Sequence, residues 1–108
     1  MGNKKAMISQ PMRGLSDEEI LKTRNRVAKQ LEALGYEVID TFFSDEYHSK
    51  EKLEEQGVKN IPVAFLAKSL ESMATVDCVC FCNGWEENRG CRIEHLVAKE
   101  YGIEMQFE

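Results

Sequence analysis

The chain has 108 residues, of which 43% are apolar and 31% charged, and a formal net charge of -5. This length suits one domain with a single core, and the composition is that of a globular protein. The acidic balance offers no surface for long nucleic acid or for an anionic membrane. We therefore expect one domain over residues 1–108, with neither of these partners.

The sequence also limits location and metal content. It has no apolar run long enough for a signal peptide or a membrane span, which predicts a cytoplasmic protein. Three cysteines, Cys78, Cys80 and Cys82, alternate along an apolar run, which favours small core filling over disulfides. With Cys91 as the fourth and no paired CxxC motif, we predict no metal and no cofactor.

The first 40 residues indicate a β-α-β unit. Lys4–Ser9 predicts a strand, and the Pro and Gly of Gln10–Gly14 predict a loop. Ser16 and Glu19 form a capping box, after which apolar residues repeat at helical spacing until a glycine ends the helix. Tyr36–Asp40 then predicts a second strand, parallel to the first.

The segment Thr41–Asn60 is polar and weakly periodic, with room for a short helix over Lys50–Gln56. Such a long connection predicts a lid. Its aromatic residues Phe42, Phe43 and Tyr47 either clamp a base or pack the loop itself, and the sequence leaves both readings open.

The remaining elements complete a sheet. Asn60 and Pro62 predict the start of a helix, and Val76–Cys82 predicts a strand in the middle of the sheet. A helix over Arg89–Tyr101 and an edge strand over Ile103–Phe107 follow. The two helices carry predicted buried stripes, at Val63, Leu66, Ala67, Leu70 and Met73 or Ala74, and at Ile93, Leu96, Val97 and Tyr101. The fold predicted is a doubly wound α/β sandwich with a mostly parallel sheet of about four strands.

Ligands of such sheets bind outside the carboxyl ends of the strands. Two loops lie there, Ser9–Gly14 and Asn83–Gly90, so we expect them to face one another with Arg13 and Asn88 converging. Glu94 follows near the first turn of the last helix. A carboxylate there is either an ionised nucleophile or a charge that complements the helix dipole, and spacing does not decide between them.

Four further residues, between the start of the predicted central strand and the last helix, have candidate roles. Gly90 lacks a side chain, which would let a ligand approach the backbone. Trp85 either stacks a base or covers the sheet edge. Asp77 is predicted to be structural, and His95 points about 100° away from Glu94 on a helix, so we assign it no role.

Three segments, Ile8–Gly14, Asp77–Phe81 and Gly84–His95, resemble in that order the nucleoside 2-deoxyribosyltransferase-like superfamily, most nearly its small branch with a GWxxSxGxxxE signature. The resemblance covers most of the chain and is sharpest over Gly84–Ala98. It implies a flavodoxin-like sheet and a glutamate, matched by Glu94, that attacks C1′ of a deoxyribosyl group and expels the base. The resulting ester passes to another base in transferases, or to water in deoxynucleoside monophosphate glycosidases.

The resemblance also implies roles for substrate-binding residues. Arg13 matches an arginine that helps to hold a 5′-phosphate, which suits the forked guanidinium. Asn88 lies where the family has a Ser or Asp that contacts the sugar or phosphate end of the substrate. The expected substrate-binding set is Ser9, Gln10, Met12, Arg13, Gly14, Ser69, Trp85, Asn88 and Gly90.

Two positions depart from the family pattern. Met7 stands where a Tyr often touches the nucleophile, and Ser69 stands where an Asp usually serves the leaving base. Losing a positioned proton donor costs about 10²–10⁴ in rate. We therefore also consider a catalytically weak or inactive module that binds nucleotides or sugar phosphates, and a structural protein that uses the loop Phe42–Tyr47 as an interface. A homodimer or larger assembly is expected, because the sheet leaves an edge to cover.

Overall fold

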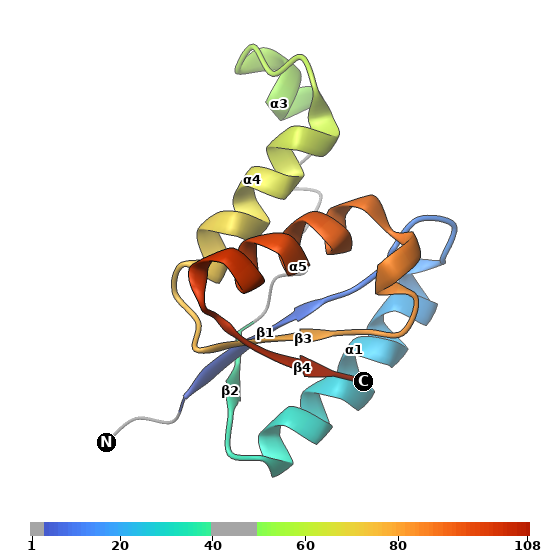
Figure 1. The fold of residues 1–108 in the computed structure, drawn as a ribbon. Helices are drawn as coiled ribbons and strands as arrows, with labels where there is room; N and C mark the ends of the chain where they lie inside the picture. The colour runs from blue at the N-terminus through green and yellow to red at the C-terminus, as the bar shows by residue number, and fades with distance from the viewer. Residues whose placement is uncertain (1–3, 40–49) are drawn as a thin grey trace.

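The computed structural model describes residues 4–39 and 50–108, which form a three-layer α/β sandwich (Figure 1). Its sheet contains β1 (Lys5–Ser9), β2 (Glu37–Val38), β3 (Cys78–Phe81) and β4 (Glu104–Phe107). The strand order is β2-β1-β3-β4 and every pairing is parallel. This is the flavodoxin-like order, so the predicted fold class is confirmed, with β3 inside the sheet and β4 at an edge.

Helices cover both faces of the sheet (Figure 1). One face is covered by α1 (Asp17–Ala33), and the other by α4 (Ile61–Met73) and α5 (Arg89–Tyr101). The short helix α3 (Lys50–Glu55) confirms the helix predicted there and lies beyond the start of α4. A 3-10 helix at Trp85–Glu87 connects β3 to α5.

Strand alternation divides the core into two clusters. Ile8 and the three alternating cysteines, Cys78, Cys80 and Cys82, pack against α1. Met7, from the opposite side of β1, packs with residues of α4 and α5. All four cysteines of the chain are free and buried, which confirms that the alternating run fills the core.

Side-chain caps fix the starts of the first long helices. The Ser16 hydroxyl accepts a hydrogen bond from the Glu19 N–H at 3.2 Å, as the capping box predicts. The Asn60 side chain accepts one from the Val63 N–H at 3.1 Å. Each cap satisfies a backbone donor that the helix itself leaves unpaired, so these boundaries follow from local sequence.

The inward face of α5 agrees only in part with the predicted one, because Val97 packs against the core but two other predicted residues do not. Leu96 is 55% exposed and Tyr101 is 80% exposed, although apolar spacing predicted both inside. The buried residues are Cys91, Glu94 and Ala98. The prediction placed only apolar residues on the inward face. It therefore did not anticipate that the carboxyl group of Glu94 occupies part of that face.

The buried stripe of α4 was also partly wrong. Val63 is 57% exposed, and Ala67 and Ala74 are exposed as well, whereas Met73 is buried and Leu70 packs on the core. Because α4 is apolar on most sides, periodicity alone does not define which side faces the sheet.

Two strands are shorter than predicted. β2 and β3 cover only the centres of the predicted strands Tyr36–Asp40 and Val76–Cys82. The aromatic residues of the predicted lid, Phe42, Phe43 and Tyr47, lie outside the described residues.

Candidate functional site

The two predicted loops meet at the carboxyl edge of the sheet. Ser9 ends β1 and is in register with Phe81, which ends β3, so both following loops leave the same edge (Figure 1). A Cβ added at Gly84 would lie 3.7 Å from Cγ of Pro11. The loop after β1 therefore contacts the loop after β3, as the parallel topology predicts.

Glu94 is buried at this end of α5. The residue is only 8% exposed and lies in the second turn of α5, on the side that also buries Cys91 and Ala98. Burial raises the pKa of the Glu94 carboxyl, and the neighbouring Ser9 hydroxyl offsets part of that rise. The carboxyl group is thus held out of bulk water rather than displayed on the helix surface.

Ser9 brings a hydroxyl to the same place from β1. The residue is 2% exposed, and its Oγ is enclosed without a hydrogen-bond partner among the residues that the structure describes. Burial raises the pKa of both Glu94 and Cys91, and the nearby Ser9 hydroxyl offsets part of each rise. A strand end and a helix turn therefore place a hydroxyl, a thiol and a carboxyl together.

Cys91 is the other reactive group in this cluster. Burial raises the pKa of its thiol to about 11, although the Ser9 hydroxyl partly opposes the rise. At neutral pH the thiol is therefore protonated and a poor nucleophile. Glu94 is the member of the cluster that can carry negative charge.

Asn88 and Gly90 form the start of α5. The Asn88 side-chain oxygen accepts a hydrogen bond from the Cys91 N–H at 3.0 Å, which leaves its amide group as a donor. A Cβ added at Gly90 would lie 3.5 Å from that oxygen, an ordinary contact. Nothing in the described part of the chain therefore requires a glycine at this position.

The loop after β1 exposes the remaining predicted binding residues. Met12, Arg13 and Gly14 are all exposed. The Arg13 guanidinium makes no hydrogen bond or ion pair with the residues that the structure describes. Gly14 has a φ of 83°, a left-handed conformation that favours glycine, so the turn itself accounts for a glycine at this position.

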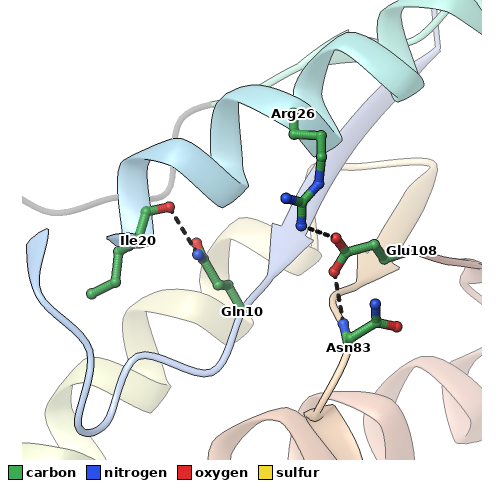
Figure 2. A network of polar contacts seen from close by, with 5 residues as sticks. All are labelled: Gln10, Ile20, Arg26, Asn83 and Glu108. Carbon is green, nitrogen blue, oxygen red and sulfur yellow. Dashed lines mark hydrogen bonds and ion pairs between the residues drawn. The ribbon is translucent and has the colours of Figure 1, made fainter. Parts of the chain in front are cut away.

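Gln10 points away from Glu94. Its Nε2 donates to the carbonyl of Ile20 at 2.9 Å (Figure 2). Its Oε1 accepts from Arg24 at 3.4 Å. Successive strand residues face opposite sides of a sheet, so Ser9 faces α5 while Gln10 faces α1. The structure does not bring these two predicted binding residues together.

The two positions that depart from the family pattern lie on the same side of the sheet as Glu94. Met7 is 1% exposed and packs in the apolar cluster with Met73 and Phe81. Ser69 is half-buried on α4. Neither side chain hydrogen-bonds to Glu94 within the described chain.

A comparison with protein families identifies the family of the chain. The model of the family described as Domain of unknown function (DUF4406) matches residues 4–107. The chain belongs to this family. Comparisons with curated proteins and with solved structures found no match. The functional argument for this DUF4406 domain therefore depends on its own geometry and residues.

Trp85 of the DUF4406 domain packs within the chain. Its indole stacks on the His95 ring, with centroids 4.3 Å apart, and contacts Phe81 with centroids 5.5 Å apart. This placement fits the reading in which Trp85 covers the sheet. No role was predicted for His95, because it points away from Glu94 on the helix. The stack could not be predicted, because stacking between residues of two different elements leaves no local pattern.

Asp77 lies at the opposite edge of the sheet. Its Oδ2 accepts a hydrogen bond from the Lys5 N–H at 2.8 Å, and its own N–H donates to the Lys5 carbonyl at 2.8 Å. Asp77 therefore joins the starts of β1 and β3, in agreement with its predicted structural role.

A second feature of the DUF4406 domain lies on the α1 side of the sheet. The carboxylate of Glu108 accepts hydrogen bonds from the Asn83 N–H, at 2.9 Å, and from the Arg26 guanidinium (Figure 2). A shallow depression of about 200 Å³ adjoins this contact. It is lined by Gln10, Pro11, Leu15, Thr23, Arg26, Cys82, Asn83 and Glu108. Sequence analysis found neither Arg26 nor Glu108, which are 82 residues apart.

Within residues 4–39 and 50–108, no helix is long and apolar enough to cross a membrane. The same residues contain no group of three or more His, Cys, Asp or Glu side chains placed to hold a metal ion. The predictions of no metal and no cofactor stay predictions.

Proposed function

We propose that this DUF4406 domain is an enzyme of N-glycosidic bond chemistry that acts on deoxynucleosides or their 5′-monophosphates. The observation that carries the proposal is the burial of Glu94, the charged residue on the buried side of α5. A carboxylate can complement a helix dipole while it is exposed, whereas burial of a charge costs free energy. The burial of Glu94 therefore favours a chemical role over an electrostatic one.

In the proposed reaction, a Glu94 carboxylate oxygen forms a bond to C1′ while the C1′–N bond breaks. The bonding electrons leave with the base, which takes up a proton, and a glycosyl ester remains on Glu94. Water or a second base then attacks C1′ and regenerates the carboxylate. Because the attacking form is ionised, activity should rise with pH through the elevated pKa of Glu94.

Two residues of the loops at the carboxyl edge of the sheet support an anionic, sugar-containing substrate. Arg13 is exposed on the loop after β1 and is unpaired among the described residues, so its guanidinium is available to a 5′-phosphate. Asn88 uses only its oxygen as a helix cap, so its amide can donate to the substrate. In this proposal both residues bind the substrate and neither takes part in bond breaking.

The test is release of free base. The protein, at high concentration, is incubated with a panel of deoxynucleosides and deoxynucleoside 5′-monophosphates, and free base is followed by chromatography. We expect release by the native chain and none by Glu94→Gln. Glu100→Gln, an exposed residue of the same helix, is the matched control and should retain activity. Absence of base release from every substrate would count decisively against the proposal.

The second candidate is a nucleotide- or sugar-phosphate-binding module with weak or no turnover. The residues that favour it are Met7, which is sealed in the apolar core, and Ser69, which cannot act as a general acid. Such a module should be stabilised by its ligand without forming product. A raised melting temperature without base release would select this candidate, and no change with any nucleotide or sugar phosphate would exclude it.

We also propose a homo-oligomer acting in the cytoplasm. The edge strand β4 carries Phe107, which is 53% exposed, and an uncovered edge is a site for association. The free buried cysteines fit a reducing compartment. Light scattering that gives the mass of one chain at micromolar concentration would contradict the oligomer.

A further inference from the structure

The Ser9 hydroxyl is a buried donor without an assigned partner. Its Oγ is enclosed, and it forms no hydrogen bond within residues 4–39 and 50–108. Buried polar groups in folded proteins are nearly always paired, so an unpaired one needs an explanation. A hydroxyl group can also rotate, so its O–H can turn toward whichever neighbour accepts most strongly.

Two polar neighbours on α5 compete for this donor. Ser9 lies on the face of β1 that α4 and α5 cover, close enough to Cys91 and Glu94 to offset part of the rise in pKa that burial causes in each. A protonated thiol is a weak acceptor, whereas a carboxylate is a strong one, and hydrogen bonds to ionised acceptors are shorter and stronger. The ionised carboxylate should therefore be the preferred acceptor of the hydrogen bond from Ser9.

We propose that Ser9 is the positioning residue of Glu94, whose ionised carboxylate accepts a hydrogen bond from the Ser9 hydroxyl and is thereby held toward the carboxyl edge of the sheet. The proposed hydrogen bond belongs to the state of the folded chain in which Glu94 is ionised, and it does not require that the chain be an enzyme. Only its catalytic consequence rests on the proposed function: Ser9 does not touch the reacting carbon, and acts on the reaction through Glu94.

The electrostatic surroundings of Glu94 make this donor important. Burial raises the pKa of Glu94, and Ser9 is the group of the described chain that opposes the rise. Cys91, on the same helix, stays a neutral thiol. From α4, Lys68 and Glu71 are exposed and pair with one another at 3.8 Å. Without Ser9, the ionised form needed for attack would be less populated at neutral pH.

The experiment measures the ionisation of Glu94 directly. The chain is prepared with glutamate labelled at the side-chain carboxyl carbon, and the chemical shift of Glu94 is titrated by NMR. The spectrum of Glu94→Gln identifies the Glu94 resonance, because that signal alone disappears. In Ser9→Ala, the midpoint should move to higher pH, because the donor to the charged form has been removed.

Three variants distinguish positioning from a general packing effect. Ser9→Thr keeps the hydroxyl and should restore the native midpoint. Cys91→Ala removes the competing acceptor and leaves Ser9 free for Glu94, so the midpoint should not rise. If Ser9→Ala fails to fold by circular dichroism, Ser9→Cys, which is nearly the same size but a weak donor, takes its place and should show the upward shift.

The outcomes separate this inference from the proposed function. An unchanged Glu94 midpoint in a folded Ser9→Ala or Ser9→Cys chain overturns the positioning role, whatever the activity. An upward shift without base release from any deoxynucleotide supports the positioning role and counts against the enzyme. Where base release occurs, the acid limb of the pH–kcat profile should move to higher pH in Ser9→Ala, in parallel with the NMR midpoint.

Discussion

The imidazole ring of His95 stacks on the indole ring of Trp85, with ring centroids 4.3 Å apart and an interplanar angle of 15°. Phe81 contacts both rings, at centroid distances of 5.5 Å and 5.3 Å. Trp85 belongs to the connection after β3 and His95 to α5, so the stack fixes the connection against the helix that carries Glu94.

Replacing His95 should loosen this connection. We expect His95→Ala to lower the free energy of unfolding by about 1 kcal/mol, the usual contribution of an aromatic pair. Trp85 is the one tryptophan of the chain, so its fluorescence reports on the stack directly, and its emission should shift to the red. Tyr101→Ala is the control, because Tyr101 is 80% exposed, and it should change stability by less than about 0.5 kcal/mol. Unchanged tryptophan emission in His95→Ala would show that the stack does not order the connection.

Burial of Glu94 predicts a pH-dependent cost in stability. Because burial raises its pKa in the folded state, the folded chain binds more protons than the unfolded chain between the two pKa values. The free energy of unfolding therefore falls as pH rises through this interval, and remains lower above it. Glu94→Gln removes the titration, so this variant should melt at a higher temperature than the native chain at pH 8.

The stabilisation of Glu94→Gln should vanish in acid. Below the unfolded pKa, the native Glu94 is protonated in both states, and the two chains should melt alike. Glu100→Gln, on the exposed side of α5, should show neither effect. A Glu94→Gln chain that is less stable than the native chain at pH 8 would mean that the charge of Glu94 is stabilising.

Glu108 predicts the opposite dependence on pH. Burial acts to raise the pKa of its carboxyl, but the Asn83 N–H and the Arg26 guanidinium outweigh burial and lower the pKa. The resulting stabilisation is present above the unfolded pKa and is lost as pH falls through the lower folded pKa. At pH 7, Glu108→Gln should lose roughly 1–2 kcal/mol of stability, because a hydrogen bond to a charged acceptor is weakened.

The Arg26 contact should contribute less than the Asn83 contact. The Arg26 side chain is 56% exposed, whereas that of Glu108 is 9% exposed, and water screens an exposed ion pair. Arg26→Ala should therefore cost less than about 1 kcal/mol. Denaturant unfolding of both variants at pH 7 and at pH 3 tests the ranking, and a larger loss for Arg26→Ala than for Glu108→Gln would reverse it.

Local signals in the sequence accounted for most of the fold. The caps at Ser16 and Asn60 predicted helix starts, and two short apolar runs predicted the interior strands. The parallel direction of the strands then followed, because helices separate successive strands. The edge at which Glu94 lies could be predicted for the same reason, since parallel strands place their carboxyl ends together.

The detailed surroundings of Glu94 could not be predicted from local pattern. The apolar stripe predicted Leu96 inside α5, whereas the buried positions include a carboxylate, and no periodicity rule places a charge there. The meeting of Ser9 with α5, and of Arg26 with Glu108, joins segments that are far apart in the sequence. Such contacts depend on how the helices pack on the sheet, and no local sequence pattern predicts that packing.

Gly90 provides a last test, because its effects on stability and on binding should have opposite signs. A Cβ at this position makes only an ordinary contact, 3.5 Å from the Asn88 side-chain oxygen, and Gly90 lies within α5. Alanine is favoured over glycine in a helix, so Gly90→Ala should raise the free energy of unfolding by roughly 0.5 kcal/mol. The added methyl group should nevertheless weaken the thermal stabilisation produced by deoxynucleoside 5′-monophosphates. In Gly102→Ala, the control, the φ of 70° strains alanine, so stability should fall by about 1 kcal/mol while ligand stabilisation persists. A Gly90→Ala chain that responds to these nucleotides as the native chain does would show that no ligand approaches the backbone at the start of α5.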